Sequence, residues 1–328
     1  MSHSAAPSQD RDTYQPTIDY SPWEQDLALQ PRVQAIIAEA AEAGVGARLV
    51  VDTPEGKLRV LAGVRGSRLP WRAPAQAVFE RGEARSCASV IAAPIYGPPG
   101  SRGALLLYED PAYPLEAGEY LARAHAARIE QAISASSSRL AATHGAVDAL
   151  YQALAAHDDR TARHAITVRR LTRILGQAME VPPHTLIEWE WAALLHDVGK
   201  IAVPLSLLRK PSPLDDAEWA TIRQHPSAGE RIIRAVPALC AVGTAVRHHH
   251  ERWDGAGYPD RLSGDAIPLA SRVVTLVDAY ETMRTGRPYR TAMTRDEALD
   301  ELRRAASAQF DPQLAVLFSR VDVGATLP

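Results

Sequence analysis

The stretch that decides the fold is Leu194-Leu195-His196-Asp197-Val198-Gly199-Lys200. An apolar run that includes Trp189 and Trp191 predicts a helix that extends to the His–Asp pair, and Gly199 ends that helix. Adjacent His and Asp side chains at a helix end can bind one divalent ion together, and the Asp can offer its second oxygen to a neighbouring ion. Such a dipeptide alone is far more often a surface pair, so its interpretation depends on the other motifs of the chain.

Histidines supply that context, because eight of the eleven fall between His157 and His250. Asp278 follows the apolar run 273–277, where an unpaired carboxylate would be costly to bury. Nitrogen and carboxylate donors without cysteine suit Fe, Mn, Ni or Zn. The alternative is a set of ordinary core histidines and solvated acids. The candidate ligands are too many for one four-coordinate ion and predict two metal ions that share a bridge: His164, His196, Asp197, His225, His249, His250 and Asp278.

The bulk composition limits the class of protein. A length of 328 residues allows two domains, and fractions of 46% hydrophobic and 23% charged residues are typical of a globular protein. A net charge of −3 argues against binding to a nucleic-acid polymer. No stretch approaches the roughly 18–20 apolar residues of a membrane span, and the N-terminus lacks a signal-peptide pattern. We therefore expect a cytoplasmic protein without a membrane anchor.

The N-terminal third predicts a tail and a small mixed domain. Residues 1–22 are polar without an apolar period, which predicts a disordered tail. Residues 23–112 begin with a helix around Val33–Ile37. Short β-like runs follow at 48–52, 58–62, 89–96 and 103–108, with a helix near 74–81. This pattern predicts a small α/β domain of the kind that senses signals.

Residues 113–156 predict a long connector helix. Apolar and small residues follow a 4-3-4-3 spacing from Ala122 to Leu154, which is the seam of a candidate coiled coil. This interpretation predicts a homodimer; the alternative is one amphipathic helix packed on its own domain. The expected dimer contacts are Ile129, Ile133, Leu140, Val147 and Leu154.

The rest of the chain, from 150 to 321, has a helical pattern. Helices are expected at 158–179, 184–199, 216–235, 238–250, 268–284, 295–306 and 312–319. The predicted fold class is therefore α+β: a small N-terminal α/β domain, a connector helix and a C-terminal all-α domain.

Ordered motifs in this C-terminal half resemble those of a known family. Besides the His196–Lys200 stretch they are Lys210-Pro211-Ser212-Pro213-Leu214, His225-Pro226, His249-His250-Glu251-Arg252-Trp253-Asp254-Gly255-Ala256-Gly257-Tyr258-Pro259, Arg287-Pro288-Tyr289-Arg290 and Phe310-Asp311-Pro312. Together they resemble the HD-GYP family, a branch of the HD phosphohydrolases that hydrolyses cyclic di-GMP. The N-terminal domain resembles a GAF domain more loosely, through the runs 89–96 and 103–108.

The resemblance assigns the metal ligands to two sites. It implies an HD-type site made by His164, His196, Asp197 and Asp278. It implies that Asp197 bridges to a second ion held by His225, His249 and His250. Some family members bind a third metal through a Glu four residues before the first histidine. This chain has Arg160 there, and a guanidinium cannot ligate a metal, so we expect two ions, with Fe or Mn as the best candidates.

The remaining matches imply catalysis and substrate binding. Lys200 corresponds to the family's catalytic lysine and acts with Asp197. Arg287 and Arg290 correspond to positions that hold the substrate phosphate; the alternative is surface charges beside a Pro turn. The Gly257-Tyr258-Pro259 loop is a candidate contact for signalling partners such as a diguanylate cyclase.

The activity implied by the resemblance is metal-dependent hydrolysis of cyclic di-GMP under control of the N-terminal domain. The product would be linear pGpG, or GMP after a second cut. One alternative is a catalytically silent receptor for cyclic di-GMP, which the complete ligand set disfavours. Another is hydrolysis of a related cyclic dinucleotide such as cyclic GMP-AMP, because no residue pattern separates the two substrates.

Overall fold

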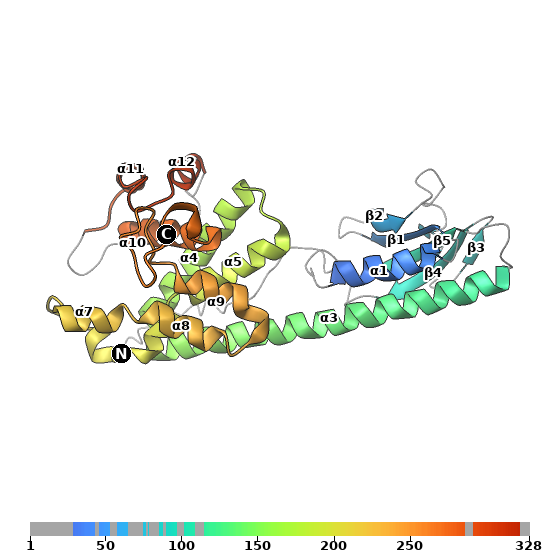
Figure 1. Ribbon diagram of the computed structural model, residues 1–328, viewed down its shortest axis with the longest axis horizontal. Coiled ribbons are helices and arrows are strands. Elements are labelled where there is room, and N and C mark those ends of the chain that lie inside the picture. Colours follow the sequence, from blue (N-terminus) through green and yellow to red (C-terminus); the bar gives the residue numbers. More distant parts are fainter. Residues whose placement is uncertain are drawn as a thin grey trace, which may run out of the picture.

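The computed structural model describes residues 29–42, 46–52, 58–64, 75–76, 78, 85–87, 90–96, 102–108, 115–285 and 291–321. A small sheet and helix α1 lie at one end of the long helix α3, and a helical domain lies at the other end (Figure 1). The predicted tail at 1–22 is outside the described residues, as are Arg287 and Arg290. The chain therefore has the predicted α+β arrangement of a mixed domain, a connector helix and an all-α domain.

The N-terminal sheet has five antiparallel strands in the order β2-β1-β5-β4-β3. Its strands are β1 (Gly46–Asp52), β2 (Leu58–Val64), β3 (Arg85–Cys87), β4 (Val90–Tyr96) and β5 (Arg102–Tyr108). The four longer strands confirm the predicted β-like runs. The sequence did not predict β3, since three residues are too few to show an alternation.

Both faces of this sheet are covered. Leu49 and Leu105 pack with α1 (Leu29–Glu42) and α3 (Leu115–His157) on one face. Val50, one residue along β1 from Leu49, points to the other face, because successive strand residues alternate. There it packs with residues 75 and 78, the described part of the helix predicted near 74–81. A small sheet with flanking helices is thus confirmed, and the likeness to a GAF domain stays a prediction.

Helix α3 runs without interruption for 43 residues. Its predicted seam is buried within the same chain: Ile129 packs under the sheet, Val147 packs in the helical domain, and Leu154 is 0% exposed. The prediction that these three residues form dimer contacts is therefore wrong. The alternative, one amphipathic helix packed on its own domains, describes them. Leu140 is partly buried against the same helical core, and the side chain of Ile133 is outside the described part.

The helical domain continues from α3 around one core. Its elements are α4 (Asp159–Ala178), α5 (Pro183–Leu195), η1 (Val198–Ala202), α6 (Leu205–Leu208), α7 (Asp216–Ile222), α8 (His225–Ile233), η2 (Pro237–Leu239), α9 (Cys240–Arg247), η3 (Gly264–Ala266), α10 (Leu269–Thr285), α11 (Arg295–Arg304) and α12 (Pro312–Arg320). Helix α5 is apolar almost all round because neighbours cover it on several sides. None of the described helices is long and apolar enough to cross a membrane.

Two predicted helices are interrupted, and both interruptions shape the site. The helix predicted at 216–235 is two helices, α7 and α8, because Pro226 lies in the first turn of α8 and cannot donate a backbone hydrogen bond to a preceding turn. The helix predicted at 184–199 ends at Leu195, and the chain turns through His196 and Asp197 into η1.

A close contact between η1 and α8 fixes the turn of the chain through His196 and Asp197. A Cβ at Gly199 would lie 1.9 Å from the backbone oxygen of His225 and 2.5 Å from the backbone nitrogen of Gly229. Only a glycine allows the two backbones to approach so closely. The contact brings the His196–Asp197 turn beside the first residue of α8.

Candidate metal centre

All seven predicted metal ligands come together in the helical domain. Helices α4 and α10, the α5–η1 turn, the start of α8 and the segment after α9 contribute them. The ligand atoms form three overlapping groups, and within each group they lie within 4.8 Å of one another. The groups are His225–His249–His250, His164–His196–Asp278 and His196–Asp197–His249. The third group joins the first two, so the ligands form one continuous centre.

Three of the histidines are oriented in the same way. Their Nδ1 atoms lie within hydrogen-bond distance of the carbonyl oxygen three residues earlier, at 2.7 Å for His196, 2.8 Å for His225 and 2.6 Å for His249. A proton on Nδ1 leaves Nε2 as a lone-pair donor directed into the centre, as is usual for metal-binding histidines. The Nε2 atoms of His225 and His249 are 3.3 Å apart, and two lone pairs so placed repel unless a cation lies between them. These residues therefore fit a metal ion.

The opposite side of the centre, the carboxylate side, contains His164 with Asp278 and Glu281. His164 on α4 contacts Asp278 through Nε2, at 2.9 Å, and Glu281 through Nδ1. Burial would lower the pKa of His164, but the two carboxylates outweigh it and raise that pKa to about 10. Burial would raise the pKa of Asp278, but its hydrogen bond to His164 holds it far below the usual range. Two carboxylates facing one imidazole give this side a negative balance that favours a cation.

Glu281 is a site residue that the sequence analysis did not identify. Its side chain is 5% exposed, and it lies one turn after Asp278 on α10. A carboxylate that contacts the far nitrogen of a ligating histidine fixes the ring and raises its basicity as a ligand. The signal in the sequence was a second acid three residues after Asp278 in the same mostly apolar helix.

Asp197 lies between the two sides. Its Oδ1 is 3.2 Å from Nε2 of His225, and its Oδ2 is 3.3 Å from Nε2 of His196. Burial would raise its pKa, but the charge of Lys200 and the contact with His196 bring it well below the ordinary value. The carboxylate is therefore ionised and offers one oxygen to each side, as a bridging ligand must.

The imidazole side of the centre is the group His225, His249 and His250, and two of these histidines have a lowered pKa. Burial, and then neighbouring imidazoles, lower the pKa of His249 well below its usual value and that of His250 to about 3. Neutral imidazole is the form that binds metals. The preceding His248 turns away from the centre, with Nε2 2.9 Å from Oδ2 of Asp260. Of the three consecutive histidines, only the two predicted ligands face the centre.

Lys200 lies at the edge of the centre. It belongs to η1, its side chain is 24% exposed, and its Nζ is 2.6 Å from Oδ2 of Asp197. The ammonium is thus held beside the bridging carboxylate and remains partly accessible. Such a group can neutralise charge that develops on a phosphate bound at the centre.

The Gly257-Tyr258-Pro259 loop also lies beside the centre. A Cβ at Gly257 would lie 2.4 Å from the backbone nitrogen of Arg252, so a glycine is needed for the loop to pack this closely. The half-buried ring of Tyr258 lies over His250, with centroids 4.9 Å apart. Burial raises the pKa of the Tyr258 hydroxyl above its ordinary value. The loop therefore forms part of the wall of the centre, and its predicted contact with a partner stays a prediction.

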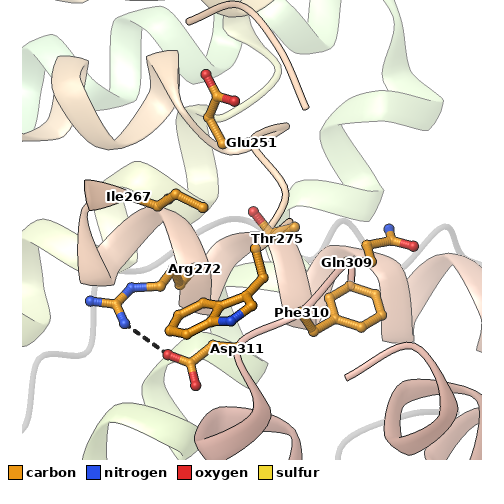
Figure 2. Close-up of a pocket in the computed structure, with 8 residues that line it drawn as sticks. Glu251, Ile267, Arg272, Thr275, Gln309, Phe310 and Asp311 are labelled. Carbon is orange, nitrogen blue, oxygen red and sulfur yellow. Dashed lines mark hydrogen bonds and ion pairs between the residues drawn. The ribbon is translucent and has the colours of Figure 1, made fainter. Parts of the chain in front are cut away.

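A cavity near the centre is too small for a nucleotide. Figure 2 shows its lining, in which the guanidinium of Arg272 is paired with Asp311 at 2.8 Å. Its volume of about 10 Å³ holds about one water molecule. Thr275, which also lines it, donates a hydrogen bond of 2.6 Å to the backbone oxygen of His249. The cavity wall thus supports the ligand segment and does not bind substrate.

The chain is similar to known proteins over much of its helical domain. Residues 148–314 match the model of a family described as HD domain. A cyclic di-GMP phosphodiesterase of Pseudomonas aeruginosa is 37% identical over 202 residues, which cover 60% of this chain and 47% of that protein. The cyclic di-GMP phosphodiesterase response regulator RpfG of Xanthomonas campestris pv. campestris is 42% identical over 126 residues, covering 38% and 33%. A 3'3'-cGAMP-specific phosphodiesterase of Vibrio cholerae is 34% identical over 153 residues, covering 47% and 33%. The chain thus spans less than half the length of these relatives.

Proposed function

The chain belongs to the HD domain family, and on that premise we propose that it is a metal-dependent phosphodiesterase that hydrolyses cyclic di-GMP. The observation that carries the proposal is the junction of two ligand groups through His196, Asp197 and His249. Two metal sites side by side can stabilise both the attacking and the leaving oxygen of a phosphodiester. Relatives named as cyclic di-GMP phosphodiesterases support the choice of substrate.

The proposed metals are two divalent ions, with Fe or Mn favoured by the nitrogen and carboxylate donors. His164, His196 and Asp278 would hold one ion and His225, His249 and His250 the other, with Asp197 between them. When bound, such ions polarise a phosphoryl oxygen and lower the pKa of a water molecule. Elemental analysis should give two ions per chain. Three fully occupied ions would show that another residue supplies the ligand that Arg160 cannot.

The chain's own residues would complete the reaction. Lys200 would face the phosphate and balance its charge, while Asp197 keeps the ammonium in place at 2.6 Å. Arg287 and Arg290 are proposed to hold a substrate phosphate, a task that suits the planar guanidinium. The proposed product is linear pGpG, or GMP after a second cut at the same centre.

A related substrate is the second candidate, favoured by the relative named as specific for 3'3'-cGAMP. The test is chromatography of the products after purified protein, loaded with Mn or Fe, has been incubated separately with cyclic di-GMP, cyclic GMP-AMP and cyclic di-AMP. We expect pGpG from cyclic di-GMP, and none after chelation of the metal. Binding of cyclic di-GMP without any product under either metal would instead identify a silent receptor.

The N-terminal domain is proposed to regulate this activity in the cytoplasm, as a GAF-like sensor. Support comes from α3, which packs under the sheet at Ile129 and in the helical core at Val147 without a break. Ile129→Ala, far from every ligand, should change turnover but not metal content if the helix transmits a signal. A homodimer and a partner at the Gly257-Tyr258-Pro259 loop are further proposals, to be tested by light scattering and by pull-down with a diguanylate cyclase.

A further inference from the structure

A row of flat side chains leads from the metal centre to the protein surface. Tyr258 lies over the ligand His250, with ring centroids 4.9 Å apart. The guanidinium carbon of Arg223 is 5.6 Å from the ring of Tyr258 and 6.0 Å from that of Trp219. Trp219 belongs to α7, and Arg223 caps the C-terminal end of that helix. The row therefore joins α7 to the rim of the centre.

The two outer members of the row, Trp219 and Arg223, are both exposed. Trp219 is 43% exposed, whereas most large apolar side chains of the described segments are buried. Arg223 is also exposed, and no described carboxylate lies within ion-pair distance of it. Its guanidinium thus has free N–H donors, and part of the Trp219 indole is open to another flat ring.

The fold itself does not need this arrangement. Helix α7 is fixed at its start by a capping box between Asp215 and Glu218 and by the ion pair of Lys210 with Glu218, at 2.6 Å. None of these contacts involves Trp219 or Arg223. An open indole and an unpaired guanidinium beside a reaction centre therefore point to a ligand.

We infer that Trp219 and Arg223 form a subsite for one purine base of the cyclic dinucleotide. The inference rests on the proposed function and names residues that select its substrate. Bases stack on aromatic side chains and on guanidinium planes, and the N–H groups of Arg match the O6 and N7 acceptors of guanine. The row begins at the metal ligand His250, so these groups are within reach of a base attached beside a phosphodiester bound at the centre.

The test compares two diesters, one with bases and one without. Trp219→Ala is assayed with cyclic di-GMP and with bis(p-nitrophenyl) phosphate. Loss of one stacked base should raise KM for cyclic di-GMP about tenfold, because stacking on an aromatic ring is worth that much or more. The kcat for cyclic di-GMP and all constants for the base-free diester should stay unchanged. Trp219→Phe should retain most of the affinity, and Val316→Ala, another exposed apolar residue, serves as the control.

Arg223 gives an independent arm. Arg223→Ala should also raise KM for cyclic di-GMP about tenfold, and Arg223→Lys should not restore it, because an ammonium lacks the planar face. Arg231→Ala, at an exposed arginine of α8, should leave KM unchanged for both substrates. Equal effects of Trp219→Ala on both diesters, or no effect on either, would overturn the subsite.

A calorimetric Kd for cyclic di-GMP separates failure of the subsite from failure of the proposed function. If the wild-type protein leaves cyclic di-GMP intact, the proposed function fails. The subsite is then tested by binding alone: Trp219→Ala should still raise the Kd for cyclic di-GMP about tenfold. An unchanged Kd in that variant, or no detectable binding by the wild-type protein, would refute the subsite.

Discussion

The two sides of the metal centre hold their ligands by different chemistry. On the imidazole side, His225 and His249 are fixed by backbone carbonyls, and His250 has a pKa lowered to about 3 by burial. On the carboxylate side, His164 is fixed by Glu281 and Asp278, and its pKa is raised to about 10. His249 and His250 are therefore neutral and ready to ligate, whereas a metal that binds His164 must replace a proton.

This difference shows where a single substitution acts on both sides and where it acts on one. Asp197 offers an oxygen to each side, so its removal should affect the whole centre. Lys200 touches Asp197 but is not itself a candidate metal ligand. Glu281 contacts only the ring of His164 among the candidate ligands. Substitutions at these three positions should therefore change different properties: the metal content of the whole centre, the turnover, and the metal affinity of the carboxylate side.

The largest effect is expected from Asp197→Ala. Removal of the bridging carboxylate should release metal from both sides and abolish turnover, because neither group retains its full ligand set. Metal content by elemental analysis and turnover of cyclic di-GMP measure the outcome. Asp158→Ala is the matched control, since Asp158 is another buried aspartate but bonds Thr161 and Arg209 outside the centre. Retention of both ions by the Asp197 variant would show that the two sides do not depend on a bridge.

A smaller effect is expected from Lys200→Ala. Turnover should fall on the order of 10²-fold, as it does when one electrostatic or proton-transfer group is removed, with metal content and thermal midpoint unchanged. Arg231→Ala is the control, because that arginine is an exposed cation of α8 and is not a candidate metal ligand. Full turnover in the Lys200 variant would exclude a catalytic role. Loss of metal would instead mean that Lys200 orders the centre through Asp197.

The sequence predicted the ligands better than it predicted what surrounds them. The seven ligand positions came from the clustering of histidines, the Asp278 that follows an apolar run and the ordered motifs, and the structure brings all seven into one centre. Glu281 was missed because a contact between α4 and α10 joins residues 117 positions apart in the chain. Nothing in local spacing reports such a pairing.

The connector shows the same limit. The spacing from Ala122 to Leu154 correctly predicted a helix with one apolar face, but not what covers that face. In the structure the sheet covers it at Ile129 and the helical core covers it at Val147, so no partner is needed there. Likewise, the apolar period through 216–235 did not reveal the break before Pro226. The helix is interrupted there because proline has no backbone N–H to donate, and the spacing of apolar side chains does not report this.

Glu281→Gln should act on the carboxylate side alone. The amide keeps the size of the side chain but loses its charge, so metal affinity at the His164 side should fall about tenfold while the imidazole side keeps its ion. A titration that resolves two binding steps measures this. Glu251→Gln is the control, since Glu251 is equally buried but accepts a hydrogen bond from the backbone of Asp260. An equal loss at both steps would mean that the two sides are not separate.

The smallest effect concerns the connector, which contributes none of the candidate metal ligands. No described atom lies within 4 Å of the position that a Cβ at Gly145 would take, and this residue is in the interior of α3. Gly145→Ala should therefore stabilise the protein by about 0.5–1 kcal/mol, since glycine within a helix loses more backbone entropy than alanine. The midpoint of urea unfolding measures the change.

Gly199→Ala is the opposite control, because its Cβ would collide with the backbone of His225 and should destabilise the centre. If Gly145→Ala instead lowers the midpoint, and light scattering shows a dimer dissociating, a second copy must pack against this exposed face of α3. The homodimer would then form on the side opposite the seam that the heptad spacing predicted.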